Sequence, residues 1–199
     1  MILCVTGPMA AGKNAASSIL EKKGFACVDA DLLVHQAVEN AKEEILASFG
    51  SLADEKGLPL LTENGHINRR NLGALIFQSP ELIKKQEDIV YPILNGLFED
   101  FMEENKGRNL VINATVLYKV PLIKKVDSVL FIDAPMLQRL FRAKKRDGMS
   151  LKLILQRFKA QRNLFAKYKK SVADTVRVGN TGSMKKLEWK IDKFLTERR

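Results

Sequence analysis

The chain has 199 residues and a formal net charge of +10 at pH 7. Hydrophobic residues make up 46% and charged residues 28% of the sequence, a balance that excludes an intrinsically disordered chain and suits one globular domain. No apolar run approaches the roughly 20 residues of a membrane-spanning helix. The start at Met1 lacks the basic region of a signal peptide, so we expect neither membrane nor secretion.

The excess positive charge lies in one segment, which we call the basic stretch, from Arg142 to Lys170. It holds 11 basic residues and one acid, Asp147, while the rest of the chain is balanced. This placement predicts a polyanionic partner, either nucleic acid or the phosphates of a small molecule. A solvated basic face without a partner is the alternative that composition alone leaves open.

The two cysteines, Cys4 and Cys27, both lie in apolar runs. We expect two buried thiols in a reducing compartment and exclude a disulfide or metal framework. The cytoplasm is the predicted location.

Short apolar runs and helical periodicity alternate along the chain. Buried strands are predicted at 2–6, 25–28, 109–113, 128–132 and 175–178. Helices are predicted at 12–23, from about 32, at 68–77, from 79, after Pro135, after Ser150 and from about 183. We expect a loop at 51–65 and a kink or helix end at Pro92. The alternation predicts an α/β fold with a five-stranded parallel sheet and helices on both faces.

The sequence Gly-Pro-Met-Ala-Ala-Gly-Lys-Asn at 7–14 follows the first strand and opens the first helix. It has the spacing of a phosphate-binding P-loop, whose glycines let the backbone wrap with its N–H groups pointing at phosphate oxygens. Lys13 would reach the β- and γ-phosphates as a point charge. The motif's final Ser or Thr, which holds Mg²⁺, is here Asn14, whose carbonyl oxygen is an acceptable ligand for a hard cation.

Asp29 and Asp31 follow the second strand, at the edge where open α/β sheets bind ligands. Two residues apart in an extended segment, they would point the same way. One such carboxylate would accept or orient the proton of an acceptor hydroxyl, while the other would cap the next helix. His35 and His66 have no ligand-spaced partners, and we expect structural or surface roles for both.

The basic stretch fits a lid that closes over a triphosphate. Arg142, Arg146 and Arg157 lie in or beside two predicted helices joined by an Asp147-Gly148 turn. An arm that binds nucleic acid would need the same charge together with a stacking platform. The aromatic residues instead suggest helix packing; they are Phe141, Phe158, Phe165 and Tyr168.

Together these motifs resemble the dephospho-CoA kinase family, which uses ATP to phosphorylate the 3′-hydroxyl of dephospho-CoA. The resemblance runs over almost the whole chain. Besides the P-loop, it rests on Val-Asp-Ala-Asp at 28–31, Gly-His-Ile-Asn-Arg at 65–69 with Leu72 and Ile76-Phe77, Val-Tyr-Pro at 90–92, Asp-Ala-Pro at 133–135, Arg142 with Arg-Asp-Gly at 146–148, Arg157 with Gln161, Ala-Asp at 173–174 and Asn-Thr-Gly at 180–182.

The resemblance implies catalytic roles for Asp31 as the base, for Lys13 and for Arg142. It implies an ATP site formed by Met9, Ala10, Ala11, Gly12, Lys13, Asn14, Ala15, Arg142, Arg157 and Asn180. It implies a dephospho-CoA site that involves Asp29, Asp31, Arg69 and Tyr91. The cofactors are then ATP and Mg²⁺, with Asn14 as the candidate metal ligand. The partners are ATP and dephospho-CoA without nucleic acid or membrane, and the protein is a monomer or weak homo-oligomer.

The implied architecture is a three-layer P-loop kinase fold in one domain. Its core would comprise 1–31, 108–139 and 172–199, with a helical acceptor-binding region at about 32–107 and a small helical lid at about 140–171.

The sequence departs from the family pattern at four positions. Asn113 replaces an acid after the third strand, and Lys119 replaces another acid. Tyr91 replaces a His, and Asn14 replaces the P-loop Ser. These changes leave open a nucleotide-binding protein with lost or altered acceptor activity. A basic nucleic-acid-binding protein on a P-loop scaffold and a nucleoside-monophosphate kinase also remain alternatives, because the fold does not name the acceptor.

Overall fold

The computed structural model describes residues 1–198, except for the side chain of Asp147. The chain divides into two compact units, Met1–Ala30 with Asn105–Arg199, and Asp31–Glu104. We call them the sheet unit and the helical unit.

The sheet unit is built on a five-stranded parallel sheet with the order β2-β3-β1-β4-β5. Its strands are β1 (Ile2–Thr6), β2 (Ala26–Asp29), β3 (Leu110–Asn113), β4 (Ser128–Asp133) and β5 (Thr175–Gly179). All five lie within one or two residues of the predicted runs. The α/β class and the parallel sheet predicted from the sequence are therefore confirmed.

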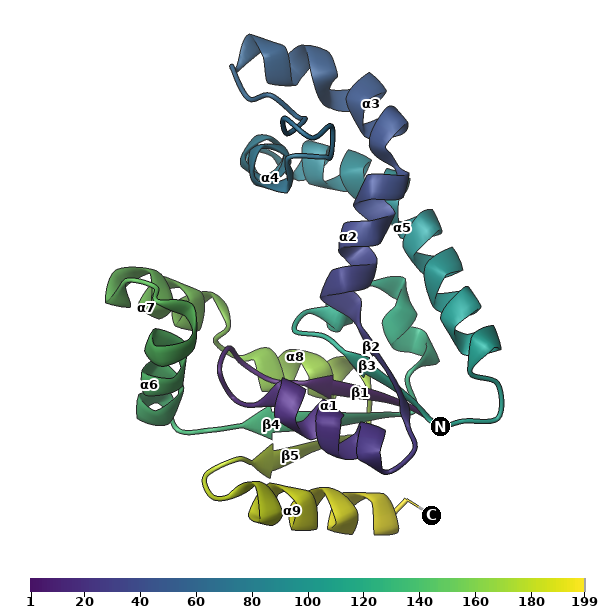
Figure 1. The fold of residues 1–199 in the computed structure, drawn as a ribbon, viewed down its shortest axis with the longest axis vertical. Coiled ribbons are helices and arrows are strands. Elements are labelled where there is room, and N and C mark those ends of the chain that lie inside the picture. Colours follow the sequence, from purple (N-terminus) through teal and green to yellow (C-terminus); the bar gives the residue numbers. More distant parts are fainter. Residues whose placement is uncertain (199) are drawn as a thin grey trace. The chain divides into compact units, whose positions relative to one another are not determined.

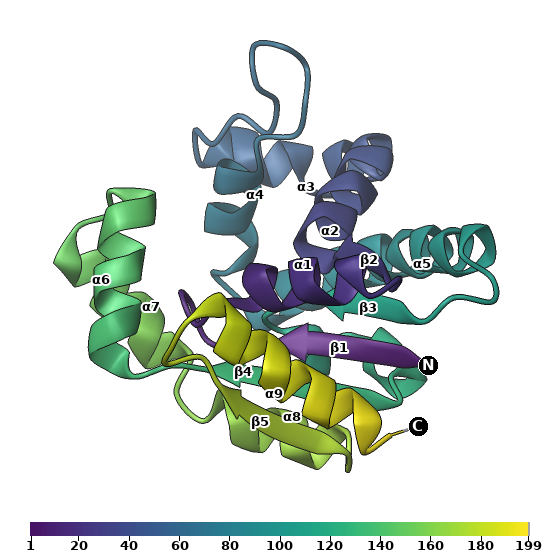
Figure 2. The same cartoon turned by 60° about the horizontal axis from the view of Figure 1, so that its bottom comes forward.

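Helices cover both faces of this sheet (Figures 1 and 2). The helices α1 (Lys13–Lys22) and α9 (Met184–Thr196) pack on one face, where Leu3 and Val5 of β1 enter a shared apolar core. The helix α8 (Leu164–Ser171) and the 3₁₀ turns η1 (Leu117–Lys119) and η2 (Pro121–Lys125) lie on the other. Cys4 and Thr6, which alternate with the first pair, are fully buried, as a strand covered on both faces requires.

The basic stretch forms a pair of helices followed by α8. They are α6 (Met136–Asp147) and α7 (Leu151–Ala160), joined at Gly148, whose φ of +60° closes the turn. Ser150 caps α7 by accepting the N–H of Leu153 at 3.3 Å, as the sequence predicted. Asp147, the acid of the predicted turn, has a side chain outside the described residues.

The helical unit contains most of α2 (Ala30–Asn40), together with α3 (Lys42–Glu55), α4 (Arg69–Ile76) and α5 (Pro80–Glu104). The prediction of a loop from residue 51 was wrong, because α3 runs to Glu55. Ile45, Phe49 and Ala53 recur every four residues on its buried face, and this stripe outweighs the poor helix formers Gly50 and Ser51.

The helix α5 passes through Pro92 and does not end there. Buried side chains on both sides of the proline, Ile89 and Val90 before it and Leu94 and Phe98 after it, give the helix one continuous apolar stripe. Tertiary burial of that stripe outweighs the lost backbone hydrogen bond.

Candidate active site

The loop from Gly7 to Gly12 connects β1 to α1 and requires glycine at both ends. Gly7 has φ of +148°, and a Cβ there would lie 2.0 Å from the carbonyl oxygen of Ile132. Gly12 has φ of +108°, and a Cβ there would lie 2.2 Å from Nδ2 of Asn180. Only glycine avoids both the steric clash and the strained dihedral. The glycines of the motif therefore allow the loop to pass close to β4 and to the end of β5.

The first helix begins directly after this loop, at Lys13. No side chain caps it at Gly12, so its first N–H groups are available to an external acceptor. The Nζ atom of Lys13 donates to the carbonyl of Gly7 at 3.3 Å, which folds the side chain back over the loop. A helix N-terminus with a lysine above it favours an anion, and phosphate is the anion this geometry suits.

Arg142 of α6 and Asn180 after β5 meet at the loop residue Ala11. Asn180 is buried, and its Nδ2 donates to the carbonyl of Ala11 at 2.9 Å. The guanidinium of Arg142 donates to the same carbonyl at 3.5 Å and to the carbonyl of Asn180 at 3.2 Å. Since a guanidinium carries five N–H donors, Arg142 can hold both carbonyls and still face an anion.

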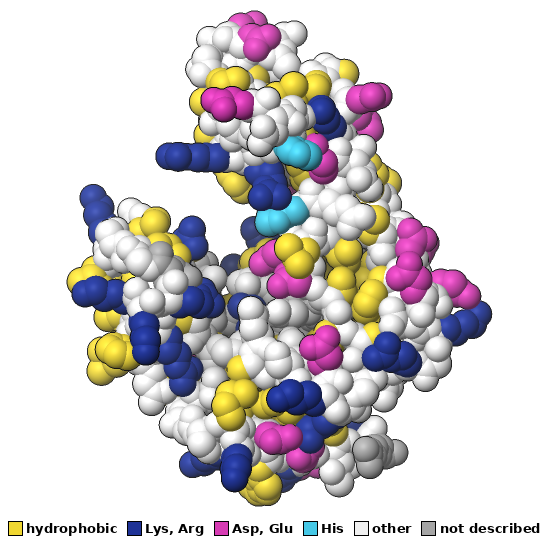
Figure 3. All heavy atoms as spheres, viewed as in Figure 1, with side chains coloured by type: hydrophobic (Ala, Val, Ile, Leu, Met, Phe, Trp, Pro, Cys, Tyr) yellow, Lys and Arg dark blue, Asp and Glu magenta, His cyan; other side chains and the backbone are white. Residues whose placement is uncertain are grey.

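A cavity of about 690 Å³ opens beside these residues. It is lined by Ala10, Gly12, Phe141, Arg142, Lys145 and Arg146. Phe141 is 71% exposed, so the expectation that it packs between helices was wrong. The lysines and arginines of α6 and α7 gather on this part of the sheet unit (Figure 3). Arg157 is an exposed residue of α7. The cavity joins an aromatic face to several cations, a combination that suits a nucleotide.

The two asparagines that depart from the family pattern touch each other. Nδ2 of Asn113, at the end of β3, donates to Oδ1 of Asn14, the second residue of α1, at 3.0 Å. Asn113 is 8% exposed, and its own Oδ1 is a buried atom without a hydrogen-bond partner among the described residues. Asp29 ends β2 directly beside Asn113 in the parallel register. The side chains of Asn14 and Asn113 thus meet at the start of α1, and Asp29 is the strand neighbour of Asn113.

Asp31, Arg69 and Tyr91 belong to the helical unit. Asp31 is exposed in the first turn of α2, so the expected extended spacing from Asp29 was wrong, because the helix already begins at Ala30. Arg69 is the exposed first residue of α4. The hydroxyl of Tyr91 donates to Oε1 of Glu87 at 2.8 Å, and burial together with this carboxylate raises the pKa of the tyrosine.

The two histidines are exposed, and the two cysteines belong to the strands β1 and β2. His66 is exposed and pairs with Glu39 at 3.0 Å through Nδ1, and His35 is exposed on α2. Burial raises the pKa of Cys4 to about 12, and burial followed by the charge of Glu21 raises the pKa of Cys27 to about 11. Cys4 is buried as expected, whereas Cys27 is only half-buried. Both thiols are free, as the sequence predicted.

Sequence reasoning missed residues that reach the loop from α6 and α7. The Nε atom of Arg139 donates to the carbonyl of Met9 at 2.9 Å, and the N–H of Met9 donates to Oε1 of Gln161 at 2.7 Å. Gln161 is part of the family motif, but the motif alone implies no role for it. The only signal that could have found Arg139 is its place one turn before Arg142, on the same face of a basic helix.

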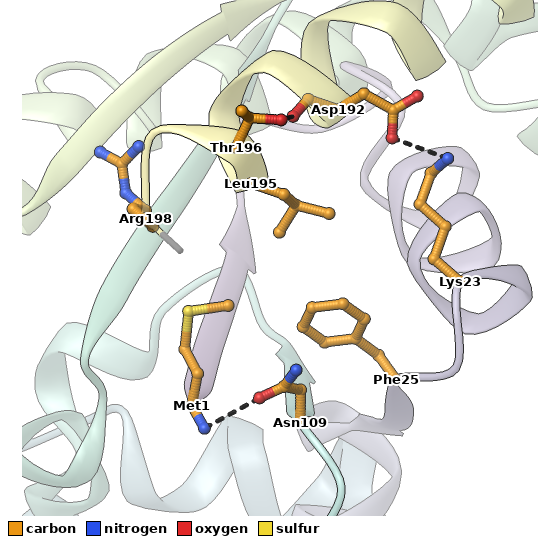
Figure 4. A pocket seen from close by; sticks show the side chains of 8 residues that line it. All are labelled: Met1, Lys23, Phe25, Asn109, Asp192, Leu195, Thr196 and Arg198. Atoms are coloured by element: carbon orange, nitrogen blue, oxygen red, sulfur yellow. Dashed lines mark hydrogen bonds and ion pairs between the residues drawn. The ribbon is translucent and has the colours of Figure 1, made fainter.

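A second cavity, of about 420 Å³, lies at the opposite edge of the sheet (Figure 4). Met1, Phe25 and Asn109 line it at the amino ends of three strands. Its charges are paired within the chain, since Lys23 binds Asp192 at 2.7 Å and the Met1 amine donates to Asn109 at 3.0 Å. Ligands of open α/β sheets bind at the carboxyl ends of the strands, so this cavity is not the candidate site.

Two structural features are absent from the described part of the chain. Within 1–198, no helix is long and apolar enough to cross a membrane. Those residues also contain no group of three or more His, Cys, Asp or Glu side chains placed to hold a metal ion.

Known sequences resemble the chain over nearly its full length. A family model described as dephospho-CoA kinase matches residues 1–186. The dephospho-CoA kinase of Treponema denticola is 38% identical over 195 residues, which cover 96% of this chain and 87% of that protein. The dephospho-CoA kinase of Treponema pallidum is 34% identical and covers 99% and 95%.

Solved structures resemble the fold. A crystal structure from Thermus thermophilus superposes with a TM-score of 0.82 at 26% identity and covers 99% of this chain and 97% of its own. A shikimate kinase from Acinetobacter baumannii, at 15% identity and a TM-score of 0.54 with 100% and 94% covered, shares the fold alone. The P-loop kinase fold, the phosphate loop and the full-length sequence matches agree: the chain belongs to the dephospho-CoA kinase family.

Proposed function

We propose that this protein transfers the γ-phosphoryl group of ATP to the 3′-hydroxyl of dephospho-CoA, giving ADP and coenzyme A. Membership of the dephospho-CoA kinase family names the reaction. The observation that carries the proposal to this chain is the Gly7–Gly12 loop, held by Asn180 and Arg142 at the open N-terminus of α1. Phosphoryl transfer needs such a cradle, because its catalysis is mainly positioning and charge neutralisation.

ATP would bind with its phosphates at the loop and its base toward the cavity beside Phe141. The proposed contacts are Met9, Ala10, Ala11, Gly12, Lys13, Asn14 and Ala15. The N–H groups of Met9 and Ala11 donate to Gln161 and to Pro8, so the proposed phosphate donors are the other five backbone N–H groups. Lys13 would move from the Gly7 carbonyl to the β- and γ-phosphates, a short swing for a flexible side chain. Arg142 would neutralise the charge that develops on the transferred group, with Arg157 reaching it from α7, and Asn180 would fix the loop near the base.

Asp31 is the proposed base of the reaction. Its carboxylate would accept the proton of the 3′-hydroxyl as that oxygen bonds to the γ-phosphorus, while the bond from the γ-phosphorus to the β–γ bridging oxygen breaks. The electron pair of the broken bond leaves on ADP. Asp31 stands in the first turn of α2, and its side chain is exposed. Asp29, Arg69 and Tyr91 are the proposed contacts to dephospho-CoA.

The residues near the start of α1 fit a magnesium ion that arrives with ATP. Asn14 is the proposed ligand through its side-chain oxygen. The buried Oδ1 of Asn113, which has no hydrogen-bond partner among the described residues, is a second neutral oxygen of the kind a hard cation accepts. Asp29 beside Asn113 adds one carboxylate. Bound there, the ion would offset the negative charge of the triphosphate.

The functional regions, the location and the oligomeric state of the protein are also proposals. The compact unit Asp31–Glu104 supports an acceptor-binding region close to the predicted 32–107, and α6 with α7 supports a lid within 140–171. The last residue of the predicted core, Arg199, lies outside the described residues. A cytoplasmic location rests on the free thiols alone. A monomer or weak homo-oligomer remains a prediction.

ADP release from ATP with Mg²⁺ tests the proposal when it is followed with dephospho-CoA, AMP or shikimate as the acceptor. We expect saturable turnover with dephospho-CoA only. Asp31→Asn keeps the size and removes the base, so kcat should fall by about two to four orders of magnitude with little change in ATP affinity. A variant with wild-type kcat would remove Asp31 from the mechanism. Circular dichroism of both proteins controls for folding.

A further inference from the structure

Met9 of the phosphate loop is fixed on both sides of its backbone by the basic helix pair. Its N–H donates to Oε1 of Gln161, 152 positions away in the sequence and directly after α7, at 2.7 Å. Its carbonyl accepts Nε of Arg139 from α6 at 2.9 Å. One loop residue is therefore hydrogen-bonded to α6 and to the residue that follows the end of α7.

The side chain of Met9 belongs to the same helix pair. It is 8% exposed and forms an apolar cluster with Ala143 of α6 and with Ile154 and Phe158 of α7. The guanidinium of Arg139 lies over the ring of Phe158, with 4.1 Å from Cζ to the ring centroid. The core between α6 and α7 is thus completed by a residue of the phosphate loop, and the helix pair and the loop form one packed body.

The loop needs this support because the next residue is strained. Ala10 has φ of +61°, a left-handed conformation that costs a residue with a Cβ about 1 kcal/mol or more. Such a conformation persists only where its neighbours hold it. Met9 is held by Gln161 and Arg139, and Ala11 is held by Asn180 and by its own N–H bond to Pro8 at 3.1 Å.

We propose that Met9 couples the helices α6 and α7 to the phosphate loop, so that these helices set the shape of the loop. In this proposal Gln161 and Arg139 are positioning residues for ATP. They act through the Met9 peptide and touch no phosphate themselves. A change in the position of the helix pair moves the loop with it, so that the arginines of α6 and the loop N–H groups reach the triphosphate together. The inference rests on the proposed function for its ligand, ATP, and not for its acceptor.

Gln161→Leu tests the coupling through Met9, because leucine is similar in size to glutamine and has no acceptor for the Met9 N–H. Loss of that bond should raise the Kd for ATP, measured by calorimetry without dephospho-CoA, roughly 5- to 10-fold. Gln161→Glu keeps an acceptor oxygen and should restore the Kd to within about 2-fold of wild type. Gln156→Leu is the matched control, since Gln156 is exposed on α7, and it should bind ATP as wild type does.

A second variant covers the case in which Gln161→Leu does not fold. Arg139→Lys keeps the charge but places no donor at the Nε position, and it should weaken ATP binding in the same direction. Urea unfolding of each variant separates loss of stability from loss of affinity.

Two results would refute the proposed coupling through Met9. One is an unchanged ATP Kd in Gln161→Leu and Arg139→Lys with lowered stability, which is the mark of a purely structural contact. The other is a Gln161→Glu variant no better than Gln161→Leu. A wild-type protein that binds ATP but does not phosphorylate dephospho-CoA would refute the proposed acceptor and would not affect the proposed coupling through Met9. A wild-type protein without ATP affinity refutes both.

Discussion

At the scale of single residues, Gly12 allows the phosphate loop to lie against Asn180, directly after β5. Its φ is +108°, and a Cβ at this position would lie 2.2 Å from Nδ2 of Asn180, so only a hydrogen atom fits there. Gly12→Ala should therefore push Asn180 from the Ala11 carbonyl and open the loop. We expect ATP affinity to fall about 10-fold or more, measured by calorimetry.

Gly24→Ala is the control for Gly12→Ala. Gly24 also has a positive φ, +92°, but a Cβ there meets no atom within 4 Å. This variant should lose about 1 kcal/mol of stability from backbone strain and keep its ATP affinity. Equal ATP affinity in the two variants would mean that the loop tolerates displacement of Asn180.

Tyr168 of α8 is a second residue with a testable function. It is fully buried, and its hydroxyl accepts the N–H of Leu117 at 2.9 Å, while burial raises its pKa. Tyr168→Phe leaves that buried N–H without an acceptor, so the free energy of unfolding should fall by about 1–3 kcal/mol in urea titrations. ATP affinity should stay unchanged. An unchanged free energy of unfolding would show that water or another group takes the place of the hydroxyl.

Residue-level signals predicted the glycine loop and missed the residues that hold it in place. The spacing of Gly7, Gly12 and Lys13 located the phosphate loop because local geometry alone demands those residue types. The contacts of Met9 with Arg139 and Gln161 span more than 100 positions and follow no local pattern. Phe141 looked like a core residue in the sequence, because composition does not show which face of a helix stays uncovered.

At the scale of elements, strands and caps followed the sequence closely. Ser150 and Ser183 accept the N–H groups three residues ahead and start α7 and α9 where they were expected. The prediction failed where packing decides, as in α3, which continues to Glu55 on the strength of its buried stripe. It also missed α8, whose buried residues Leu164 and Tyr168 pack within the sheet unit inside a segment that otherwise looks only basic.

The end of α9 is tied to the start of β5 by one ion pair. Nε and Nη2 of Arg198 each donate to Asp174 at 2.6 Å. These bonds to Arg198 lower the pKa of Asp174. Because the folded-state pKa lies below the unfolded value, the pair stabilises the protein above about pH 4 and loses its effect as the pH falls through the lowered pKa.

Arg198→Met tests this pair and its pH dependence. The Asp174 side chain is 41% exposed, so solvent screening limits the loss at pH 7 to about 0.5–1 kcal/mol of unfolding free energy. The difference between variant and wild type, measured by urea unfolding, should shrink as the pH is lowered from 7 toward 3. A difference that stays constant over this range would assign the effect to packing of Arg198 on Phe194, whose ring centroid lies 4.0 Å from Cζ.

At the scale of the whole molecule, charge and chemistry are divided along the chain. The sheet unit carries the phosphate loop and the entire basic stretch, and the helical unit carries Asp31, Arg69 and Tyr91. Asp29, the remaining proposed contact to dephospho-CoA, belongs to the sheet unit, so the proposed acceptor contacts come from both units. Asn14 and Asn113 are the departures that most directly concern this chemistry, and their mutual hydrogen bond keeps side-chain oxygens at the start of α1.

The most direct test of the proposed activity is the identity of the product. The purified protein, ATP, Mg²⁺ and dephospho-CoA are incubated, and the product is examined by phosphorus NMR and mass spectrometry. We predict one new phosphomonoester, on the 3′-oxygen of the ribose, formed in equimolar amount with ADP. ADP formed without a phosphorylated acceptor, or a phosphate on any other oxygen, would contradict the account.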